Sequence, residues 1–423
     1  MHSLRANTSK HLLGRKQQLR EAALLAFCDP WPEECARLKN VSAKEWTCLL
    51  EWLDISGLAL YFLDCLREQN CCDLLPPEVH ARLLKNLADN TERIDELIAE
   101  WLGIECKFTE AGLVHATLKG FSLWPLSIPK LALRSQLDLD FLMAEEAAEE
   151  ARRILEERGY RLCAVSGRTW EFKADEDRIG SMDDFYKSGM IRSAELHLEP
   201  IGVGIGSLLS RAQQTTFYGV DMTVLSPVDL FLGQGLHLYK HVCGEFARVA
   251  HMIEFRRHVL ARHGDKNFWC GIREQAVKEP EAGLRLGVVI LLISRVMGDF
   301  APEALTHWTV GQVPAGVVRW VELYGRRTVL ASFPGSKLYL LLQKELEAAG
   351  VVGKRSVRQS LIPRRLPPLI AHGVAGETVA ARLTRYRRQI SFVLFRFRFH
   401  VVEGIRFSRE ASRWRQHVNE VIQ

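Results

Sequence analysis

Two aspartates separated by a single residue form the pattern with the clearest chemical potential in this 423-residue chain. Asp138 and Asp140 lie in the alternating run LDLDFLM. If this run is a β-strand, the two carboxylates emerge side by side, because residues i and i+2 point to the same face. Such like charges repel unless a cation lies between them, and carboxylate oxygens are the ligands that Mg²⁺ accepts together with substrate phosphates. We therefore interpret both aspartates as ligands of Mg²⁺ or Mn²⁺.

A third carboxylate is offered by the run AELHLE. As a strand, it places Glu195, His197 and Glu199 on one face and its two leucines on the other, against the core. We predict Glu195 as the third metal ligand. His197 is expected to orient it or to contact the nucleotide, with a partly buried, hydrogen-bonded histidine as the alternative. Glu199 is expected to be a solvated residue at the strand end.

Residues suited to phosphate binding precede the aspartates. Gly120 lets backbone N–H groups approach a phosphate where the chain enters a helical turn, and Lys119 supplies a point charge. Arg134 lies four residues before Asp138, and its planar guanidinium is expected to bind the same phosphates.

The elements that must position these residues are predicted by hydrophobic periodicity. Residues 1–105 have the three- and four-residue spacing of helices, with start signals at Ser42 and Pro77. After Gly112, strands are expected at 113–120, 137–143, 161–166, 169–174 and 194–199, with a helix that ends at Gly159. The sequence thus predicts an α+β fold, in which a small mixed sheet with helices, at about 106–225, is flanked by helical N- and C-terminal regions.

Helical spacing returns in a third unit, 226–353. Its apolar run Leu286–Met297 is shorter than the roughly 20 residues of a membrane-spanning helix, so we expect a buried core helix. His237 and His241 have the i, i+4 spacing of a helical metal pair, although the zinc-protease signature is absent. Packing or capping roles are the alternative for this pair.

The fourth unit, 354–423, is basic: it holds 15 Lys/Arg and 4 Asp/Glu, whereas the whole chain has a net charge of +5. Such a segment favours an anionic partner. A proline-rich stretch at 358–376 is expected to be a linker. Beyond it, Phe395, Phe397 and Phe399 alternate with basic residues. This alternation is consistent with an ordinary half-buried strand, with a surface that stacks bases, or with an amphipathic helix on a membrane, and we favour a structural role.

Composition supports a globular protein of two or three domains, with 47% hydrophobic and 25% charged residues. The polar N-terminus has no apolar signal-peptide core. The ten cysteines contain no C-x-x-C pair, so we expect reduced thiols, no cysteine-based zinc site and a cytoplasmic protein without a transmembrane segment.

Several of these motifs occur together in one known family. The segments LKG and RSQLDLDFLM, the helix ending in ERGY and the later ELH strand resemble the uncharacterised nucleotidyltransferase-like family of the DNA-polymerase-beta-type nucleotidyltransferase superfamily, over about residues 106–260. The resemblance implies a small nucleotidyltransferase-type mixed sheet. It also implies Mg²⁺-dependent transfer of a nucleoside monophosphate from an NTP such as ATP to a hydroxyl or phosphate, with release of pyrophosphate. Lys119-Gly120 replaces the Gly-Ser turn of the wider superfamily.

Two other functional hypotheses remain open at the level of sequence. One is a catalytically inactive nucleotidyltransferase scaffold that binds a nucleotide or a partner. The other is an RNA- or DNA-interacting protein that acts through the basic C-terminal segment. The acceptor of a transfer reaction is equally open among small molecules, peptides or proteins, and RNA.

Overall fold

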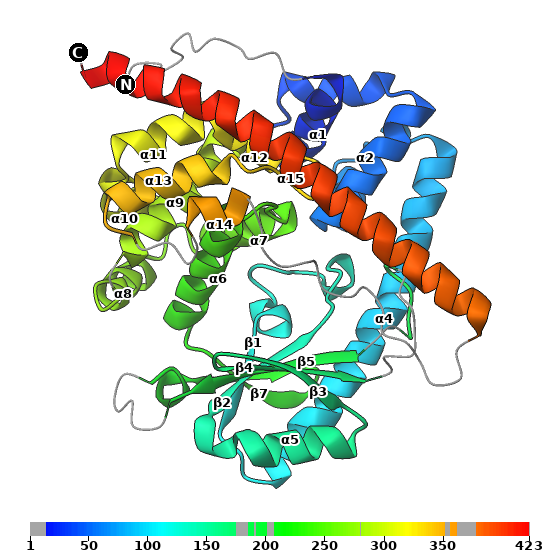
Figure 1. Cartoon of the computed structure of the whole chain (residues 1–423). Helices are drawn as coiled ribbons and strands as arrows, with labels where there is room; N and C mark the ends of the chain where they lie inside the picture. The colour runs from blue at the N-terminus through cyan, green and yellow to red at the C-terminus, as the bar shows by residue number, and fades with distance from the viewer. Residues whose placement is uncertain are drawn as a thin grey trace.

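A sheet covered by helices on one face joins a larger helical body in this protein (Figure 1). The computed structural model describes residues 14–174, 185–189, 192–200, 207–279, 281–351, 356–361 and 378–422. Within these residues a mixed α+β architecture is observed, with helical regions before and after the sheet. The predicted fold class is therefore confirmed.

From residue 14 onward, the helical spacing predicted before the sheet is observed as α1 (Arg15–Leu25), α2 (Ala43–Ser56), α3 (Ala59–Glu68) and α4 (Pro77–Glu110). The predicted start signals are confirmed. Ser42 and Glu45 form a reciprocal capping box at α2, and Pro77 occupies the first turn of α4. Helix α4 continues through Glu110, beyond the predicted boundary at residue 105.

The described residues contain one seven-stranded mixed sheet with the order β3-β4-β5-β2-β1-β7-β6. The strands are β1 (His115–Leu118), β2 (Leu139–Ala144), β3 (Arg161–Ser166), β4 (Thr169–Ala174), β5 (Arg192–Glu199), β6 (Gln213–Phe217) and β7 (Val220–Val224). The first five confirm the predicted strands. Sequence periodicity missed the hairpin β6–β7, whose turn residues Tyr218 and Gly219 both have positive φ, as a tight hairpin turn requires.

One face of the sheet packs on α4 and on α5 (Ala148–Glu157). Phe141 of β2 and Leu196 of β5 are completely buried on this face, together with Trp101 of α4. Because side chains alternate along a strand, the polar residues between these apolar ones must emerge on the opposite face. That opposite face looks toward the helical body (Figure 1).

The helical body follows the sheet in sequence. Its helices are α6 (Pro227–Val242), α7 (Val249–Ala261), α8 (Lys266–Ala276), α9 (Ala282–Met297), α10 (Glu303–Thr309), α11 (Ala315–Trp320), α12 (Arg326–Val329), α13 (Tyr339–Ala348) and α14 (Val357–Leu361). Helix α9 is the predicted buried core helix. The apolar residues of this body share one core with α1–α3. Residues 358–361 of the predicted linker lie in α14, and 362–376 lie outside the described residues.

The C-terminal segment forms one helix, α15 (Val379–Ile422), of 44 residues. The strand interpretation of its Phe-Arg alternation was therefore wrong. In a helix, residues two apart point in different directions, and indeed Phe397 is 67% exposed whereas Phe399 is 7% exposed. Among the described residues, no helix has both the length and the apolar character needed to cross a bilayer.

Candidate active site

The parallel pairing of β2 with β5 places Asp140 directly opposite Glu195. Their neighbours Phe141 and Leu196 also face each other and lie in the core against α4 and α5. Both carboxylates must therefore emerge together on the other face of the sheet. This register brings together two of the three predicted metal ligands.

A lysine and a histidine lie between these carboxylates. The ammonium of Lys119, at the end of β1, donates to Asp140 Oδ1 at 2.6 Å and lies 3.7 Å from Glu195 Oε2. Nε2 of His197 lies 2.8 Å from the same Asp140 oxygen and 3.2 Å from Glu195 Oε2. Asp140, Glu195 and His197 each present a ligand atom, and these atoms lie within 4.8 Å of one another.

The depth of the cluster differs among its members. The Asp140 side chain is 3% exposed, whereas Glu195 is 26% exposed. Burial alone would raise the pKa of Asp140, but hydrogen bonds and charge from His197 and Lys119 outweigh it and lower this pKa. Burial by itself would lower the pKa values of Lys119 and His197. The neighbouring carboxylates outweigh burial and raise both pKa values. The cluster thus keeps a buried carboxylate ionised by pairing it with cations.

Asp138 lies one residue before β2 and outside this three-residue group. Burial and the charge of Asp140 raise its pKa, although the charge of Lys119 acts in the opposite direction. Its backbone carbonyl accepts a hydrogen bond from Gln136 at 2.9 Å. The third member of this group is therefore His197. The role of Asp138 as a metal ligand remains a prediction.

The Lys119-Gly120 turn has an unusual backbone. Lys119 has φ +48° and Gly120 has φ +31°, and the short 3₁₀ helix Gly120–Leu123 follows, as expected. A Cβ on Gly120 would lie 2.3 Å from Nε2 of Gln136. Packing against Gln136 thus explains the glycine. A non-glycine residue in a strained backbone conformation costs on the order of 1–3 kcal/mol, and such residues cluster at active sites and ligand-binding turns.

Arg134 lies near the aspartates but is already paired. Its Nε donates to Glu254 of α7 at 3.1 Å, and its Nη1 donates to Gln136 at 3.2 Å. The side chain is 16% exposed. The structure therefore shows Arg134 fixing the segment before β2 against the helical body, and its predicted contact with phosphate remains a prediction.

Two further residues of the site were not assigned correctly from sequence. Thr169 of β4 lies 3.3 Å from Nδ1 of His197 through its hydroxyl and so fixes the orientation of the ring. Glu199 is not a solvated strand end: it accepts hydrogen bonds from the hydroxyl of Ser207 at 2.8 Å and from the backbone N–H of Leu208 at 2.7 Å. The first contact depends on the pairing of β4 with β5 and the second on the path of the chain after β5, and periodicity within a strand predicts neither.

Comparison with known proteins identifies the family of this chain. The family described as uncharacterised nucleotidyltransferase matches residues 42–298, which is more than half of the chain. A solved structure of an antigenic nucleotidyltransferase-like protein from Paracoccidioides brasiliensis is similar at 13% identity and a TM-score of 0.30, over 52% of this chain and 98% of that one. A search of curated proteins found no match. On the strength of the family match, the chain belongs to the uncharacterised nucleotidyltransferase family.

Proposed function

We propose that this protein transfers a nucleoside monophosphate from an NTP to an acceptor hydroxyl or phosphate, and that the reaction depends on Mg²⁺ or Mn²⁺. The observation that carries the proposal is the Asp140–Glu195–His197 group beside Lys119, in a chain of the nucleotidyltransferase family. Two carboxylates and a lysine on one face of a sheet match the chemistry of a metal-bound triphosphate.

The donor atoms present fit such an ion. Asp140 and Glu195 supply hard oxygen ligands within 4.8 Å of each other, and Asp138 lies close enough for the charge of Asp140 to raise its pKa. Asp140 and Glu195 would hold a divalent ion, which would neutralise phosphate charge and polarise the phosphoryl group. Imidazole is a softer donor, so His197 is assigned to orienting the carboxylates rather than to binding Mg²⁺.

The other residues act on the substrates. Lys119 supplies positive charge to the triphosphate, and Gly120 and Arg134 are proposed to contribute further contacts to it. The acceptor oxygen attacks the α-phosphorus, the bond from that phosphorus to the bridging oxygen breaks, and pyrophosphate leaves. Glu195, the more exposed carboxylate, takes the proton from an acceptor hydroxyl. Positioning and charge neutralisation supply most of the rate enhancement.

The proposal is tested by incubating the full-length protein with Mg²⁺ or Mn²⁺, labelled NTPs and a broad panel of acceptors, and measuring label transfer and pyrophosphate. Asp138→Asn, Asp140→Asn and Glu195→Gln should each lower the rate by about 10²-fold or more, since each removes charge that acts in the transition state. Asp221→Asn is the matched control, because Asp221 is exposed on β7, away from the cluster; its rate should equal that of the wild type.

The outcomes separate the two functional hypotheses. Metal-dependent NTP binding without pyrophosphate release would support the inactive scaffold. Equal activity in wild type and Asp140→Asn would contradict the assignment of the site. Failure to bind any NTP in the presence of either metal would overturn both hypotheses.

A further inference from the structure

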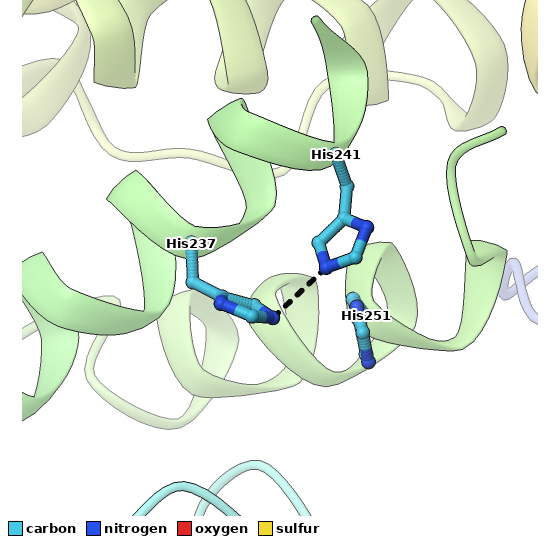
Figure 2. Close-up of side chains that lie close together, drawn as sticks. All are labelled: His237, His241 and His251. Carbon is cyan, nitrogen blue, oxygen red and sulfur yellow. Dashed lines mark hydrogen bonds between the residues drawn. The ribbon is translucent and has the colours of Figure 1, made fainter. Parts of the chain in front are cut away.

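Three histidines meet beside the sheet, between two helices of the helical body. His237 and His241 lie one turn apart on α6, and His251 reaches them from α7 (Figure 2). The ring centroids lie 4.6 Å apart for His237–His241, 5.0 Å for His241–His251 and 5.5 Å for His237–His251. The sequence offered only the helical pair, because His251 joins it through the packing of α7 against α6.

The spacing of the ring nitrogens suits a single metal ion. The Nε2 atoms of His237 and His241 are 3.0 Å apart, and one nitrogen from each of the three rings lies within 4.8 Å of the others. Zn–N bonds of about 2.0–2.1 Å at tetrahedral angles separate ligand nitrogens by about 3.3 Å. Small side-chain rotations therefore bring all three nitrogens to the bonding distance of one ion.

We propose that His237, His241 and His251 form a binding site for one divalent transition-metal ion of the Zn²⁺ class, separate from the carboxylate site. Imidazole favours Zn²⁺ and its neighbours in the first transition series, whereas Mg²⁺ and Ca²⁺ favour oxygen. Three protein ligands leave one tetrahedral position for water or a substrate oxygen. This is the arrangement of catalytic zinc sites, since structural sites use four protein ligands.

The surroundings of the rings agree with metal binding. Among the described residues, the buried Nδ1 of His251 has no hydrogen-bond partner, a situation that costs about 1–3 kcal/mol unless a ligand relieves it. Burial lowers the pKa of all three histidines, so the rings are in the neutral form that binds metals. The nearby cations Lys119 and Arg248 favour the same neutral form, although their charges also repel a metal ion, so the imidazole ligands must outweigh that repulsion.

The site also lies close to the carboxylate cluster. Two residues of that cluster, Lys119 and Asp140, influence the pKa of His237. The charge of Lys119 lowers this pKa, whereas the charge of Asp140 raises it. A cation bound by the three histidines therefore lies within the electrostatic reach of the face on which the nucleotide is proposed to bind.

The test uses tag-free, full-length protein that has been treated with a chelator and desalted, and Co²⁺ as the spectroscopic probe for Zn²⁺. We expect one equivalent of Co²⁺ to bind with the intense d–d absorption of a tetrahedral ion, and equimolar Zn²⁺ to displace it. The ten cysteines are free thiols, so thiolate-to-cobalt charge-transfer bands report any binding by cysteine. A spectrum dominated by these charge-transfer bands would overturn the proposal.

Variants assign the site. His241→Gln and His251→Gln should lose the d–d bands and the rise in melting temperature that Zn²⁺ produces in the wild type. His263→Gln is the matched control, because His263 is an exposed histidine just beyond α7; it should retain both signals. Asp140→Asn should also retain them. Loss of the signals in Asp140→Asn but not in His241→Gln would assign the ion to the carboxylate group and overturn the proposal.

A second measurement does not depend on the folding of any variant. Wild-type protein is modified with diethyl pyrocarbonate with and without equimolar Zn²⁺, and the modified histidines are identified by mass spectrometry. Protection of His237, His241 and His251, with His263 equally reactive in both samples, supports the site. Equal modification of His241 with and without Zn²⁺ overturns it.

Discussion

At the scale of single residues, the ammonium of Lys119 shapes the properties of the carboxylate cluster. It lies 2.6 Å from an oxygen of Asp140 and 3.7 Å from one of Glu195. Two unit charges about 4 Å apart interact by roughly 4 kcal/mol at an effective dielectric constant near 20. The lysine therefore neutralises part of the negative charge that attracts a divalent cation.

Replacing Lys119 should separate metal binding from catalysis. In Lys119→Met the carboxylates lose a competing cation, so we expect Mn²⁺ to bind about tenfold more tightly, which corresponds to about 1.4 kcal/mol. Nucleotidyl transfer should nevertheless fall by about tenfold or more, because the triphosphate loses a positive charge. Titration of Mn²⁺ followed by electron paramagnetic resonance, together with the transfer assay, measures both effects.

Lys130→Met is the control for this experiment. Lys130 also contacts two carboxylates, those of Asp64 and Glu68, at 2.7 and 2.9 Å, but it lies away from the cluster. Its loss should change neither measurement. Weaker Mn²⁺ binding in Lys119→Met than in the wild type would show that the lysine does not compete with the metal.

Local alternation explains why much of the cluster could be predicted from sequence. The runs LDLDFLM and AELHLE separate acidic from apolar residues at a period of two, which fixes the face on which each side chain lies. Their strand state is confirmed. The sequence could not provide the register between the strands, which brings His197 together with Asp140 and Glu195. It also could not provide the helix packing that brings His251 to His241.

At the scale of elements, α9 packs so closely that one of its positions has no room for a side chain. A Cβ on Gly287 would lie 2.4 Å from the backbone oxygen of Thr309, at the end of α10. Backbone cannot move aside as a flexible side chain can. We predict that Gly287→Ala lowers the free energy of unfolding by about 1–3 kcal/mol, measured by urea denaturation, despite the better helix propensity of alanine.

For a second helical glycine we expect the free energy of unfolding to change in the opposite direction. Gly233 of α6 is exposed and has no neighbouring atom within 4 Å of the position that a Cβ would occupy. The substitution therefore changes only the conformational entropy that the backbone loses on folding. Gly233→Ala should raise the free energy of unfolding by about 0.5–1 kcal/mol. If both alanine variants shift the urea midpoint in the same direction, close packing of α9 does not account for Gly287.

Helix α15 carries a second contrast, between two phenylalanines. Phe407 is 5% exposed and belongs to the main core, whereas Phe397 is 67% exposed. We predict that Phe407→Ala lowers the free energy of unfolding by about 3–5 kcal/mol and that Phe397→Ala changes it by no more than about 0.5 kcal/mol. Similar losses in both variants would mean that α15 packs along its whole length.

The difference between the expected strand and the observed helix has a physical cause. Alternation of Phe and Arg over 395–400 resembles a strand, but the segment is part of a 44-residue helix whose buried positions follow a wider spacing. Phe399, Phe407 and Trp414 are buried. Six residues with a period of two do not outweigh a helical pattern that extends on both sides of them.

At the scale of the whole molecule, α15 crosses the helical body and joins its parts (red in Figure 1). Glu410 accepts a hydrogen bond from Tyr324 and pairs with Arg327, both at 3.2 Å, and the indole of Trp414 donates to Glu345 of α13 at 2.8 Å. The C-terminal part of the helix is thus built into the core. Deleting residues 354–423 would expose that core, so charge substitutions are the cleaner probe of this segment.

The first half of α15 presents the basic surface that the composition predicted. Arg387 and Arg388 are exposed there. We predict that Arg387→Glu combined with Arg388→Glu weakens binding to single-stranded RNA and reduces the magnitude of its salt dependence by roughly 0.7 for each phosphate that the protein no longer neutralises. The melting temperature should not change, because exposed charges contribute little to stability.

Fluorescence anisotropy over a range of salt concentrations measures this effect. The control is Lys266→Glu combined with Arg273→Glu, which places the same charge change on two exposed residues of α8. Equal weakening by the control would point to net charge rather than to α15. RNA binding that is absent from the wild type would remove nucleic acid as the partner of this helix.

The parallel register of β2 and β5 has one consequence that reaches beyond the site. The register that pairs Phe141 with Leu196 also pairs Asp140 with Glu195. One alignment of the two strands therefore determines both the apolar face and the acidic face of the sheet. A shift of one strand's register by one residue would turn its acidic side chain into the core and its apolar side chains toward solvent. The packing of the interior therefore also holds the register that sets Asp140 beside Glu195.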